Sequence, residues 1–248
     1  MPIHFQNLHK RFGEKTVLAG VDLQVNDGEC FFVIGASGVG KSVLIKHLVG
    51  LLRPDAGDIY LDGSEVSRLD ERAFYDVRKR CAMVFQNSTL FDSMSCAENV
   101  ALPLRTHRGM NMHDALREAE RRLDQVHMRE FARAFPAELG DGMRKRVAIA
   151  RALTLDPAYV LFDEPTTSLD PISARRVDKL IQELSRDYGV TSIVVSHDLT
   201  SIFTIADRIA MLYQGQVRLL GTPAVFRTTA DPVVQQFITG QADGPMEV

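Results

Sequence analysis

The stretch "GASGVGKS", residues 35–42, decides the fold of this chain. It follows the apolar run "FFVI", residues 31–34, and precedes "VLIKHLVG", residues 43–50, in which apolar residues recur at helical spacing. A glycine-rich turn that ends in Lys-Ser between a strand and a helix is typical of a phosphate-binding loop, because backbone N–H groups and the helix N-terminus face the anion. We therefore predict that this segment binds a nucleotide.

Every residue of the predicted loop has a candidate role in binding phosphate or in shaping the turn. The glycines permit backbone angles that other residues resist. Lys41 is expected to reach the β- and γ-phosphates of ATP, and the Ser42 hydroxyl to coordinate Mg²⁺. The alternative is an ordinary turn with a surface lysine, which the flanking strand and helix disfavour. The predicted loop consists of Gly35, Ala36, Ser37, Gly38, Val39, Gly40, Lys41 and Ser42.

Two adjacent carboxylates follow a second apolar run in "YVLFDEP", residues 159–165. Like charges repel unless a cation or a proton lies between them. A Mg²⁺ ion for Asp163 and an attacking water for Glu164 would supply the reason for this pair. Glu164 is then the candidate general base. The alternative is an acidic pair in a surface turn.

Two more polar residues follow strand-like runs. His197 comes just after "TSIVV", residues 191–195, and is expected to contact the γ-phosphate and to polarise the attacking water. Gln86 ends "CAMVFQ", residues 81–86, and is expected to touch Mg²⁺ or the water. A structural histidine and a turn glutamine are the alternatives. Folds of this kind place ligands at the polar ends of central parallel strands.

Composition limits the class of protein. The chain has 248 residues, 45% of them apolar and 25% charged, which suits one large globular domain or one domain with an inserted lobe. A net charge of -3 offers no basic excess, so we expect no nucleic-acid partner. No apolar run approaches membrane-spanning length, the first residues lack a signal-peptide core, and three scattered cysteines suggest a reducing compartment. We expect a cytoplasmic protein.

The pattern along the chain predicts a mixed α/β fold. Short strands with turns are expected over 3–8, 21–25, 31–34 and 58–61, and mostly helix over 87–150. Residues 171–188 predict a further helix that ends before Gly189, and residues 209–221 a hairpin with a Gln-Gly turn. The near-continuous apolar runs at 158–162 and 191–195 suit central parallel strands.

In this order, these motifs resemble those of the ATP-binding subunits of ABC transporters, over nearly the whole chain. The phosphate loop is similar to the Walker A motif, "VFQ" with Gln86 to the Q-loop, and "YVLFDEP" to Walker B with Glu164 as the catalytic carboxylate. Ser168, Leu169 and Asp170 resemble the D-loop, and His197 the H-loop switch. Phe12 stands where the family places an aromatic residue that stacks on adenine.

The resemblance implies a P-loop NTPase (RecA-like) core with an antiparallel β subdomain and an inserted helical subdomain at roughly 87–150. It implies a single ATPase domain over 1–240 and a C-terminal tail over 241–248. Two such domains sandwich two ATP molecules, and each site joins the phosphate loop of one subunit to the signature motif of the other. Hydrolysis drives an integral-membrane permease, which holds the ATPase on the cytoplasmic face of the inner (plasma) membrane.

A narrower resemblance is carried by "LFDSMSCAENVALPLR", "GMRKRVAIARAL", "DEPTTSLDPI" and "DPVVQQFITGQADGP". These segments are similar to those of the ATPases of MCE-type (Mla-type) lipid transporters. The resemblance implies phospholipid or another lipid as cargo, and an MCE-domain lipid-binding protein and a small regulatory subunit as further partners. The alternative is an ABC ATPase for amino acids, ions or drugs.

The signature motif departs from the family pattern LSGGQ, which is often LSGGM in the lipid branch. Here Leu139, Gly140, Asp141, Gly142 and Met143 occupy it. Gly140 lacks the hydroxyl donor of the usual serine, and Asp141 brings a carboxylate towards a polyanion. That repulsion costs several kcal/mol at a few ångströms, unless Asp141 turns away or meets the basic run Arg144, Lys145 and Arg146.

Three interpretations follow from the altered signature. The chain pairs with a different ATPase as a heterodimer, forms a slow homodimer, or binds ATP as a weakly hydrolysing regulatory module. Because Glu164 and His197 are retained, we favour a working ATPase with an attenuated rate.

Overall fold

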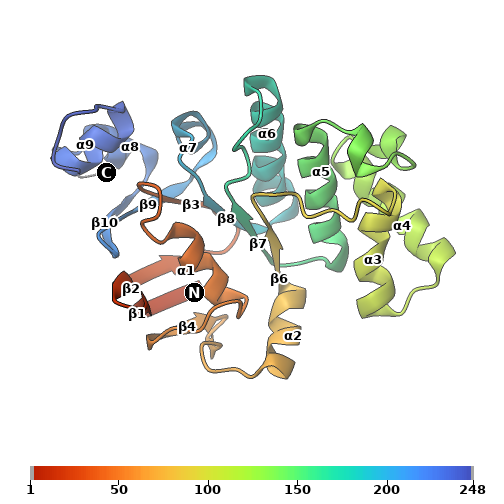
Figure 1. Ribbon diagram of the computed structural model, residues 1–248, viewed down its shortest axis with the longest axis horizontal. Helices are drawn as coiled ribbons and strands as arrows, with labels where there is room; N and C mark the ends of the chain where they lie inside the picture. The colour runs from red at the N-terminus through yellow and green to blue at the C-terminus, as the bar shows by residue number, and fades with distance from the viewer. Residues whose placement is uncertain (1–2, 247–248) are drawn as a thin grey trace.

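The computed structural model of the chain describes residues 3–246, which form two β-sheets and the helices that pack against them (Figure 1). The larger sheet has the strand order β10-β9-β3-β8-β7-β6. Its strands β3, β6, β7, β8 and β9 are parallel, and β10 is an antiparallel edge strand. The bounds are β3 Cys30–Ile34, β6 Cys81–Val84, β7 Tyr159–Asp163, β8 Thr191–Val195, β9 Arg208–Tyr213 and β10 Gln216–Gly221.

The prediction of central parallel strands from the apolar runs at 158–162 and 191–195 is confirmed, and β3 lies beside β8 in the same parallel arrangement. Every residue of β3, β7 and β8 is buried, as expected for parallel strands covered on both faces. Val195 lies opposite both Val33 and Asp163 in the ladder. The carboxyl ends of these strands therefore meet at one edge of the sheet, where the polar motifs follow them.

The smaller sheet is antiparallel and has the order β2-β1-β4-β5. Its outer hairpin is longer than the predicted strands, because residues 9–12 and 15–16, most of them polar, also pair in the ladder. Ladder pairing requires backbone groups rather than apolar side chains. Apolar residues of this sheet, such as Phe5 and Leu18, share a core with Phe31 of β3 and Leu44. The bounds are β1 Ile3–Phe12, β2 Lys15–Val25, β4 Ala56–Leu61 and β5 Ser64–Glu65.

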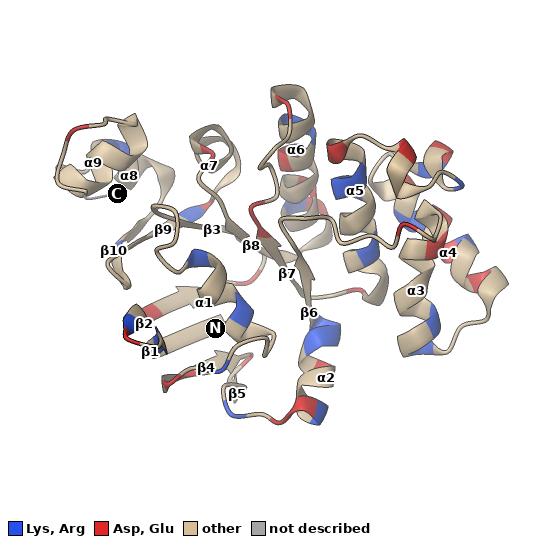
Figure 2. Ribbon diagram, in the orientation of Figure 1, with Lys and Arg blue, Asp and Glu red and all other residues tan. Residues whose placement is uncertain are grey.

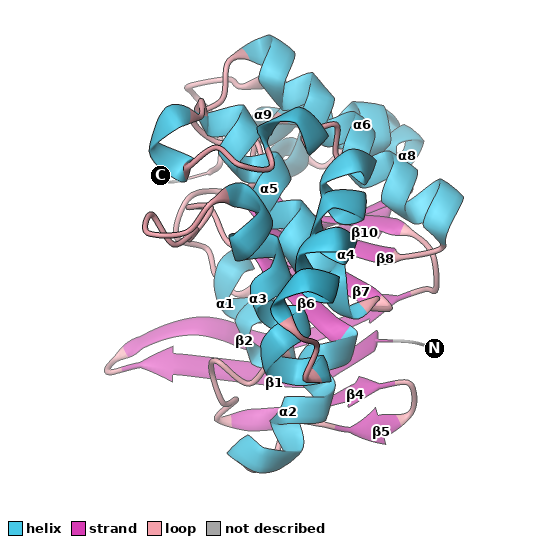
Figure 3. Ribbon diagram, turned by 90° about the vertical axis from the view of Figure 1, so that its right-hand side faces the viewer, coloured by secondary structure: helices cyan, strands magenta, loops and turns pink. Residues whose placement is uncertain are grey.

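The segment between the neighbouring strands β6 and β7 is mostly helical, as predicted. Its helices face the viewer in Figure 3, and in Figure 1 they lie at the end of the molecule away from β1 and β2. Helix α3 begins with a capping box, in which Ser95 and Glu98 satisfy each other's backbone N–H groups. The segment contains α3 Cys96–Arg108, α4 Met112–Gln125, α5 Asp141–Ala152 and the short 3₁₀ turns Arg129–Phe131, Pro136–Glu138 and Leu153–Leu155.

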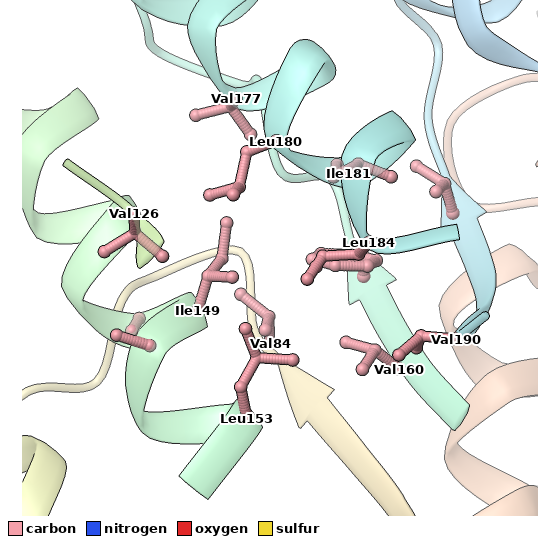
Figure 4. Packing of buried hydrophobic residues seen from close by; sticks show 14 of the residues in the cluster. Val84, Val126, Ile149, Leu153, Val160, Val177, Leu180, Ile181, Leu184 and Val190 are labelled. Atoms are coloured by element: carbon pink, nitrogen blue, oxygen red, sulfur yellow. The ribbon is translucent and has the colours of Figure 1, made fainter. Parts of the chain in front are cut away.

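Helix α6, Pro171–Tyr188, joins this helical part to the core. The side chains of Leu180 and Leu184 on α6 point towards Ile149 and Leu153 near the end of α5, and Val160 of β7 lies beside them (Figure 4). Asp170 caps the start of α6 with its side chain. The helix ends at Gly189, with a φ of 66°, as predicted.

The C-terminal helices α8 and α9 lie at the end of the molecule opposite to α3 and α4 (Figure 1). Gln214 and Gly215 both have positive φ, 49° and 76°, so the predicted Gln-Gly turn closes the β9–β10 hairpin. Residues beyond α9 fold back onto it: the Met246 N–H donates to Oε1 of Gln236 at 2.7 Å. The last two residues of the predicted tail, 247–248, lie outside the described residues. The remaining helices are α1 Lys41–Leu48, α2 Glu71–Arg80, α7 Leu199–Ile205, α8 Pro223–Thr228 and α9 Pro232–Thr239.

Among residues 3–246, no helix has the length and apolar character needed to cross a membrane.

Candidate nucleotide site

The segment "GASGVGKS" forms a tight loop between β3 and the N-terminus of α1. Gly35 and Gly40 have φ values of 140° and 113°, a region that favours glycine. A Cβ on Gly35 would lie 2.4 Å from the carbonyl oxygen of Leu212, and one on Gly40 would lie 2.9 Å from Val17. Backbone angle and space thus both require glycine at these two positions, which lets the loop wrap the start of the helix.

Lys41 is the first residue of α1, and its side chain reaches back to the start of the loop. Its Nζ donates to the carbonyl oxygens of Gly35 at 2.9 Å and Ala36 at 3.1 Å, and it is 3.9 Å from Oε1 of Glu164. Burial lowers the pKa of the ammonium, and the nearby carboxylates of Glu164 and Asp163 oppose that shift. The loop therefore holds a partly desolvated cation next to the acidic pair.

The acidic strand end comes to the same place. The Ser42 hydroxyl donates to Oδ1 of Asp163 at 2.5 Å, and Nζ of Lys46 lies 3.9 Å from the other oxygen of that carboxylate. Two hard oxygen ligands from distant parts of the sequence are thus side by side. Within residues 3–246 there is no cluster of three or more acidic, histidine or cysteine side chains that could hold a metal ion.

Both the backbone and the side chain of Glu164 are held by neighbouring groups. Its φ is 51°, in the left-handed region, and its backbone N–H donates to the carbonyl of Val195 at 2.9 Å. His197 Nδ1 lies 2.8 Å from Oε2, and Thr167 Oγ1 donates to the same oxygen at 3.1 Å. The Glu164 side chain is 13% exposed, whereas that of His197 is 62% exposed. A carboxylate held in this way presents its other oxygen to the loop.

One cavity of about 450 Å³ is lined by many of the predicted site residues, although Gly35, Ala36, Val39 and Asp163 are not among those that line it. Phe12 stands at its margin, 47% exposed, at the end of β1. Lys15 and Val17 of β2 also line it, and the sequence offered no signal for them, because they belong to no motif. The residues around the cavity are Phe12, Lys15, Val17, Ser37, Gly38, Gly40, Lys41, Ser42, Val43, Gln86, Glu164 and His197.

Gln86 lines the cavity but does not end a strand. The prediction that strand "CAMVFQ" reaches Gln86 is wrong, since β6 ends at Val84. The carbonyl groups of Phe85 and Gln86 instead accept hydrogen bonds from Nζ of Lys145, at 3.0 Å and 2.6 Å. Burial lowers the pKa of Lys145 to about 8, against the pull of Asp163 and Asp141. The Lys145 ammonium thus supplies the hydrogen bonds that strand pairing would supply if β6 were longer.

The backbone around His197 is fixed by a second network that sequence reasoning missed. Asp198 caps α7 and accepts from the Arg175 guanidinium at 2.5 Å. Arg175 also lies 2.6 Å from the buried carboxylate of Asp178, and the Ser201 hydroxyl lies within hydrogen-bond distance of both acids, 3.0 Å from Asp178 and 2.8 Å from Asp198. These residues connect the start of α6 to the segment after β8. Spacing alone could not reveal them, because Arg175 and Asp198 meet only in the fold.

Comparisons with known proteins agree with this geometry. Residues 18–167 match the family model described as "ABC transporter", which covers more than half of the chain. The chain belongs to the ABC transporter ATPase family. Like the other ATPases of this family, it binds and hydrolyses ATP, and such cassettes act in pairs with a membrane permease.

Individual relatives of this ABC ATPase cover most of its length. The intermembrane phospholipid transport system ATP-binding protein MlaF of Haemophilus influenzae is 38% identical over 98% of this chain and 92% of the relative. The methionine import ATP-binding protein MetN of Mesorhizobium japonicum is 40% identical over 93% of this chain but only 62% of the relative. A dimeric ATP-binding cassette in a post-hydrolysis state with ADP and Pi superposes with a TM-score of 0.81, 31% identity and coverage of 89% and 98%.

In this ABC ATPase the residues predicted to form the signature motif lie away from the candidate nucleotide cavity. They line a separate cavity of about 830 Å³, together with the D-loop residues Ser168, Leu169 and Asp170. Gly140 is the N-cap of α5 and has no side-chain cap, and a Cβ there would meet nothing within 4 Å. The residues of the motif that line this cavity are Gly140, Asp141, Gly142 and Met143, and Leu139 is buried just before them.

Asp141 pairs with one member of the basic run that follows it. Its carboxylate forms an ion pair with Arg144, which also donates to the carbonyl of Leu139 at 3.0 Å. Lys145 and Arg146 point elsewhere, to the carbonyls of other segments. The sequence predicts two ways to reduce the repulsion: Asp141 turns away, or it pairs with the basic run. The structure has the ion pair, and the Asp141 side chain remains 61% exposed at the start of α5.

Proposed function

We propose that this chain is the ATPase subunit of a lipid transporter of the MCE (Mla) type, with phospholipid or a related lipid as cargo. The similarity to the phospholipid transport protein MlaF over 98% of this chain and 92% of that relative carries the assignment of cargo. The cavity that joins the phosphate loop to Glu164 and His197 supports the hydrolytic role.

The phosphate loop, residues 35–42, binds the β- and γ-phosphates through its backbone N–H groups and Lys41. Phe12 stacks on the adenine from the margin of the cavity. Ser42, Asp163 and Gln86 hold Mg²⁺; the 2.5 Å contact between Ser42 and Asp163 supports this, because hydroxyl and carboxylate oxygens suit that ion. When bound, Mg²⁺ neutralises charge on the phosphates.

Glu164 takes the proton from the attacking water. A general base must be oriented as well as close. His197 and Thr167 fix one oxygen of Glu164, which leaves the other free to accept the proton. The imidazole of His197, which is largely exposed and lines the cavity, also contacts the γ-phosphate and so couples the presence of that phosphate to the position of Glu164.

The signature motif acts on a second ATPase subunit rather than on this chain's own nucleotide. The two cavities are separate within one chain, and a dimeric arrangement would bring the start of α5 to the phosphate loop of the partner. The partner is a second copy or a different ATPase. An integral-membrane permease, an MCE-domain protein and a small regulatory subunit complete the proposed assembly, which places the chain on the cytoplasmic face of the inner membrane.

The test is to tag the chain, solubilise membranes in mild detergent and identify by mass spectrometry the proteins that co-purify. Recovery of a permease together with an MCE-domain protein supports the lipid assignment. Recovery of a permease with a solute-binding protein contradicts it. A second ATPase in the same complex identifies a heterodimer.

Import of a small solute is the second candidate, because MetN is 40% identical over 93% of this chain. The chain covers 62% of that relative and 92% of MlaF. Stimulation of ATPase activity in the purified complex by phospholipid, and not by methionine, distinguishes the two.

A further inference from the structure

The loop that follows β6 is held by two basic side chains of α5, the helix that begins in the signature motif. Lys145 donates to the carbonyls of Phe85 and Gln86, at 3.0 Å and 2.6 Å. Arg151, on the same helix α5, donates to the carbonyl of Thr89 at 2.8 Å, to its hydroxyl at 3.0 Å and to the carbonyl of Ser88 at 3.3 Å. The carbonyl groups of four residues in this loop, Phe85, Gln86, Ser88 and Thr89, thus accept hydrogen bonds from side chains of α5.

The contact that Lys145 makes with this loop is buried. Lys145 is 2% exposed, so its ammonium would be a costly unpaired charge without the two carbonyls. The ladder of β6 ends at Val84, so the carbonyls of Phe85 and Gln86 have no strand partner. Charge-assisted hydrogen bonds are stronger than neutral ones. If this contact breaks, both the Lys145 ammonium and the two carbonyl groups are left without a hydrogen-bond partner.

The neighbouring basic residues of α5 provide a contrast. Helix α5 carries Lys and Arg along its length (Figure 2). Arg144 donates to carbonyls of the segment before α5, and Arg146 to those of Val126 and His127, within the helical part. Among the hydrogen bonds of residues 3–246, those of Lys145 and Arg151 are the ones that join a basic side chain of α5 to the loop from β6.

We propose that Lys145 and Arg151 tie the loop 85–89 to α5, so that Gln86 and the signature segment move as one body. Lys145 is therefore a positioning residue for Gln86, not a residue that touches nucleotide. The inference rests on the proposed role of Gln86 in the nucleotide site. Its consequence is that a partner's nucleotide, by engaging the start of α5, also sets Gln86 in this chain's own site.

Hydrogen–deuterium exchange on the assembled transporter tests the tie directly. The complex carries Glu164→Gln so that ATP persists, and exchange is measured with and without ATP. We expect ATP to protect both 85–89 and 139–144 in the otherwise unaltered chain. With Lys145→Met, protection of 139–144 should persist while that of 85–89 is lost. Arg146→Met is the matched control, because it removes a neighbouring cation that binds other carbonyls, and it should leave protection of 85–89 intact.

Steady-state kinetics of the same complex, with Glu164 restored, gives a second readout. Lys145→Met should lower kcat about tenfold, the scale of one charge-assisted hydrogen bond on a positioned group, and leave KM for ATP within about twofold. Lys145→Arg should restore most of kcat, because it retains a donor to the carbonyls. Lys145→Gln serves in place of Lys145→Met if the latter lowers the yield of folded complex.

Two results overturn the proposal: joint protection of both segments in Lys145→Met, or a kcat equal to that of the parent. A separate variant, Gln86→Ala, keeps this test distinct from that of the site itself. If Gln86→Ala has full kcat, the proposed role of Gln86 fails, whereas the exchange pattern still decides whether the loop is tied to the helix.

Discussion

His197 and Glu164 meet through a single contact, with Nδ1 of the imidazole 2.8 Å from Oε2 of the carboxylate. The same oxygen accepts from Thr167 at 3.1 Å, and the backbone of Glu164 is held in the left-handed region at a φ of 51°. A side chain with this much support has little freedom to turn. Its unbound oxygen faces the phosphate loop and Lys41, at 3.9 Å.

The first prediction concerns Glu164→Gln. The amide preserves volume but cannot accept a proton from water, so kcat for ATP should fall by roughly 10²- to 10⁴-fold, the usual contribution of a general base. Affinity for ATP should change by less than about threefold, since the phosphate loop is untouched. Phosphate release and nucleotide binding measure the two effects. Glu120→Gln on the exposed face of α4 is the control, and loss of ATP binding in Glu164→Gln would contradict the assigned role.

The second prediction concerns Phe12→Ala. The ring is 47% exposed at the edge of the nucleotide cavity, so its removal should cost stacking on adenine and little folding stability. An aromatic contact of this kind contributes about 1 kcal/mol, which corresponds to a rise in Kd for ATP of about fivefold. Fluorescence titration with ATP and with inorganic triphosphate separates the base from the phosphates.

Phe12→Tyr should retain the affinity of the parent chain, because its ring can stack equally well. Tyr188→Ala, which removes an exposed aromatic ring at the end of α6, controls for general effects of truncation. An equal loss of affinity for triphosphate in Phe12→Ala would show that the effect does not come from the adenine.

The sequence predicted the parts of the site that contiguous motifs encode. The loop 35–42 and the strand end at Asp163 are such segments, since the residues before them are uninterrupted apolar runs whose only stable place is a central parallel sheet. Parallel pairing then brings their carboxyl ends together, which is why Ser42 and Asp163 touch although 121 positions separate them.

The supporting contacts could not be predicted, because they join residues whose neighbours carry no pattern. Arg175 on α6 meets Asp198 only because α6 packs beside the segment after β8. The end of β6 at Val84 is of the same kind: the apolar run continues through Phe85, but Lys145 competes for the carbonyls that a longer ladder would use. Long-range polar contacts of this sort override local propensity.

The third prediction concerns pH and Asp178. Burial, aided by the nearby Asp198, raises the pKa of this carboxyl to about 6, and Ser201 and Arg175 offset part of the shift. The folded state therefore holds the proton more tightly than the unfolded chain does. The stabilising contribution is fully present below pH 4 and is lost as pH rises through 6, with a total on the order of 2–3 kcal/mol.

Asp178→Asn should remove this dependence while Asp198 continues to pair with Arg175. Between pH 4.5 and 7.5, the free energy of unfolding of the variant should rise relative to the parent by about 2 kcal/mol, measured by urea titration at each pH. Asp187→Asn, an exposed acid on the same helix, is the control and should track the parent. Parallel pH profiles of Asp178→Asn and the parent would refute the assignment.

The last prediction concerns the signature, where Gly140→Ser and Asp141→Gly together restore the family pattern. A Cβ at Gly140 meets no atom within 4 Å, and the N-cap position accepts serine, so the change should fit without strain. Asp141 remains 61% exposed despite its ion pair with Arg144, so a partner's γ-phosphate would still meet its charge. We expect the double variant to raise the maximal ATPase rate of the assembled complex by about three- to tenfold.

Asp141→Asn alone should give part of the gain, because it removes the charge and keeps the side chain. Arg144→Met should slow the complex further, since it leaves Asp141 without its counter-ion. An unchanged or lower rate in both Asp141 variants would mean that Asp141 does not oppose the nucleotide, and would favour a regulatory role for this half of the dimer.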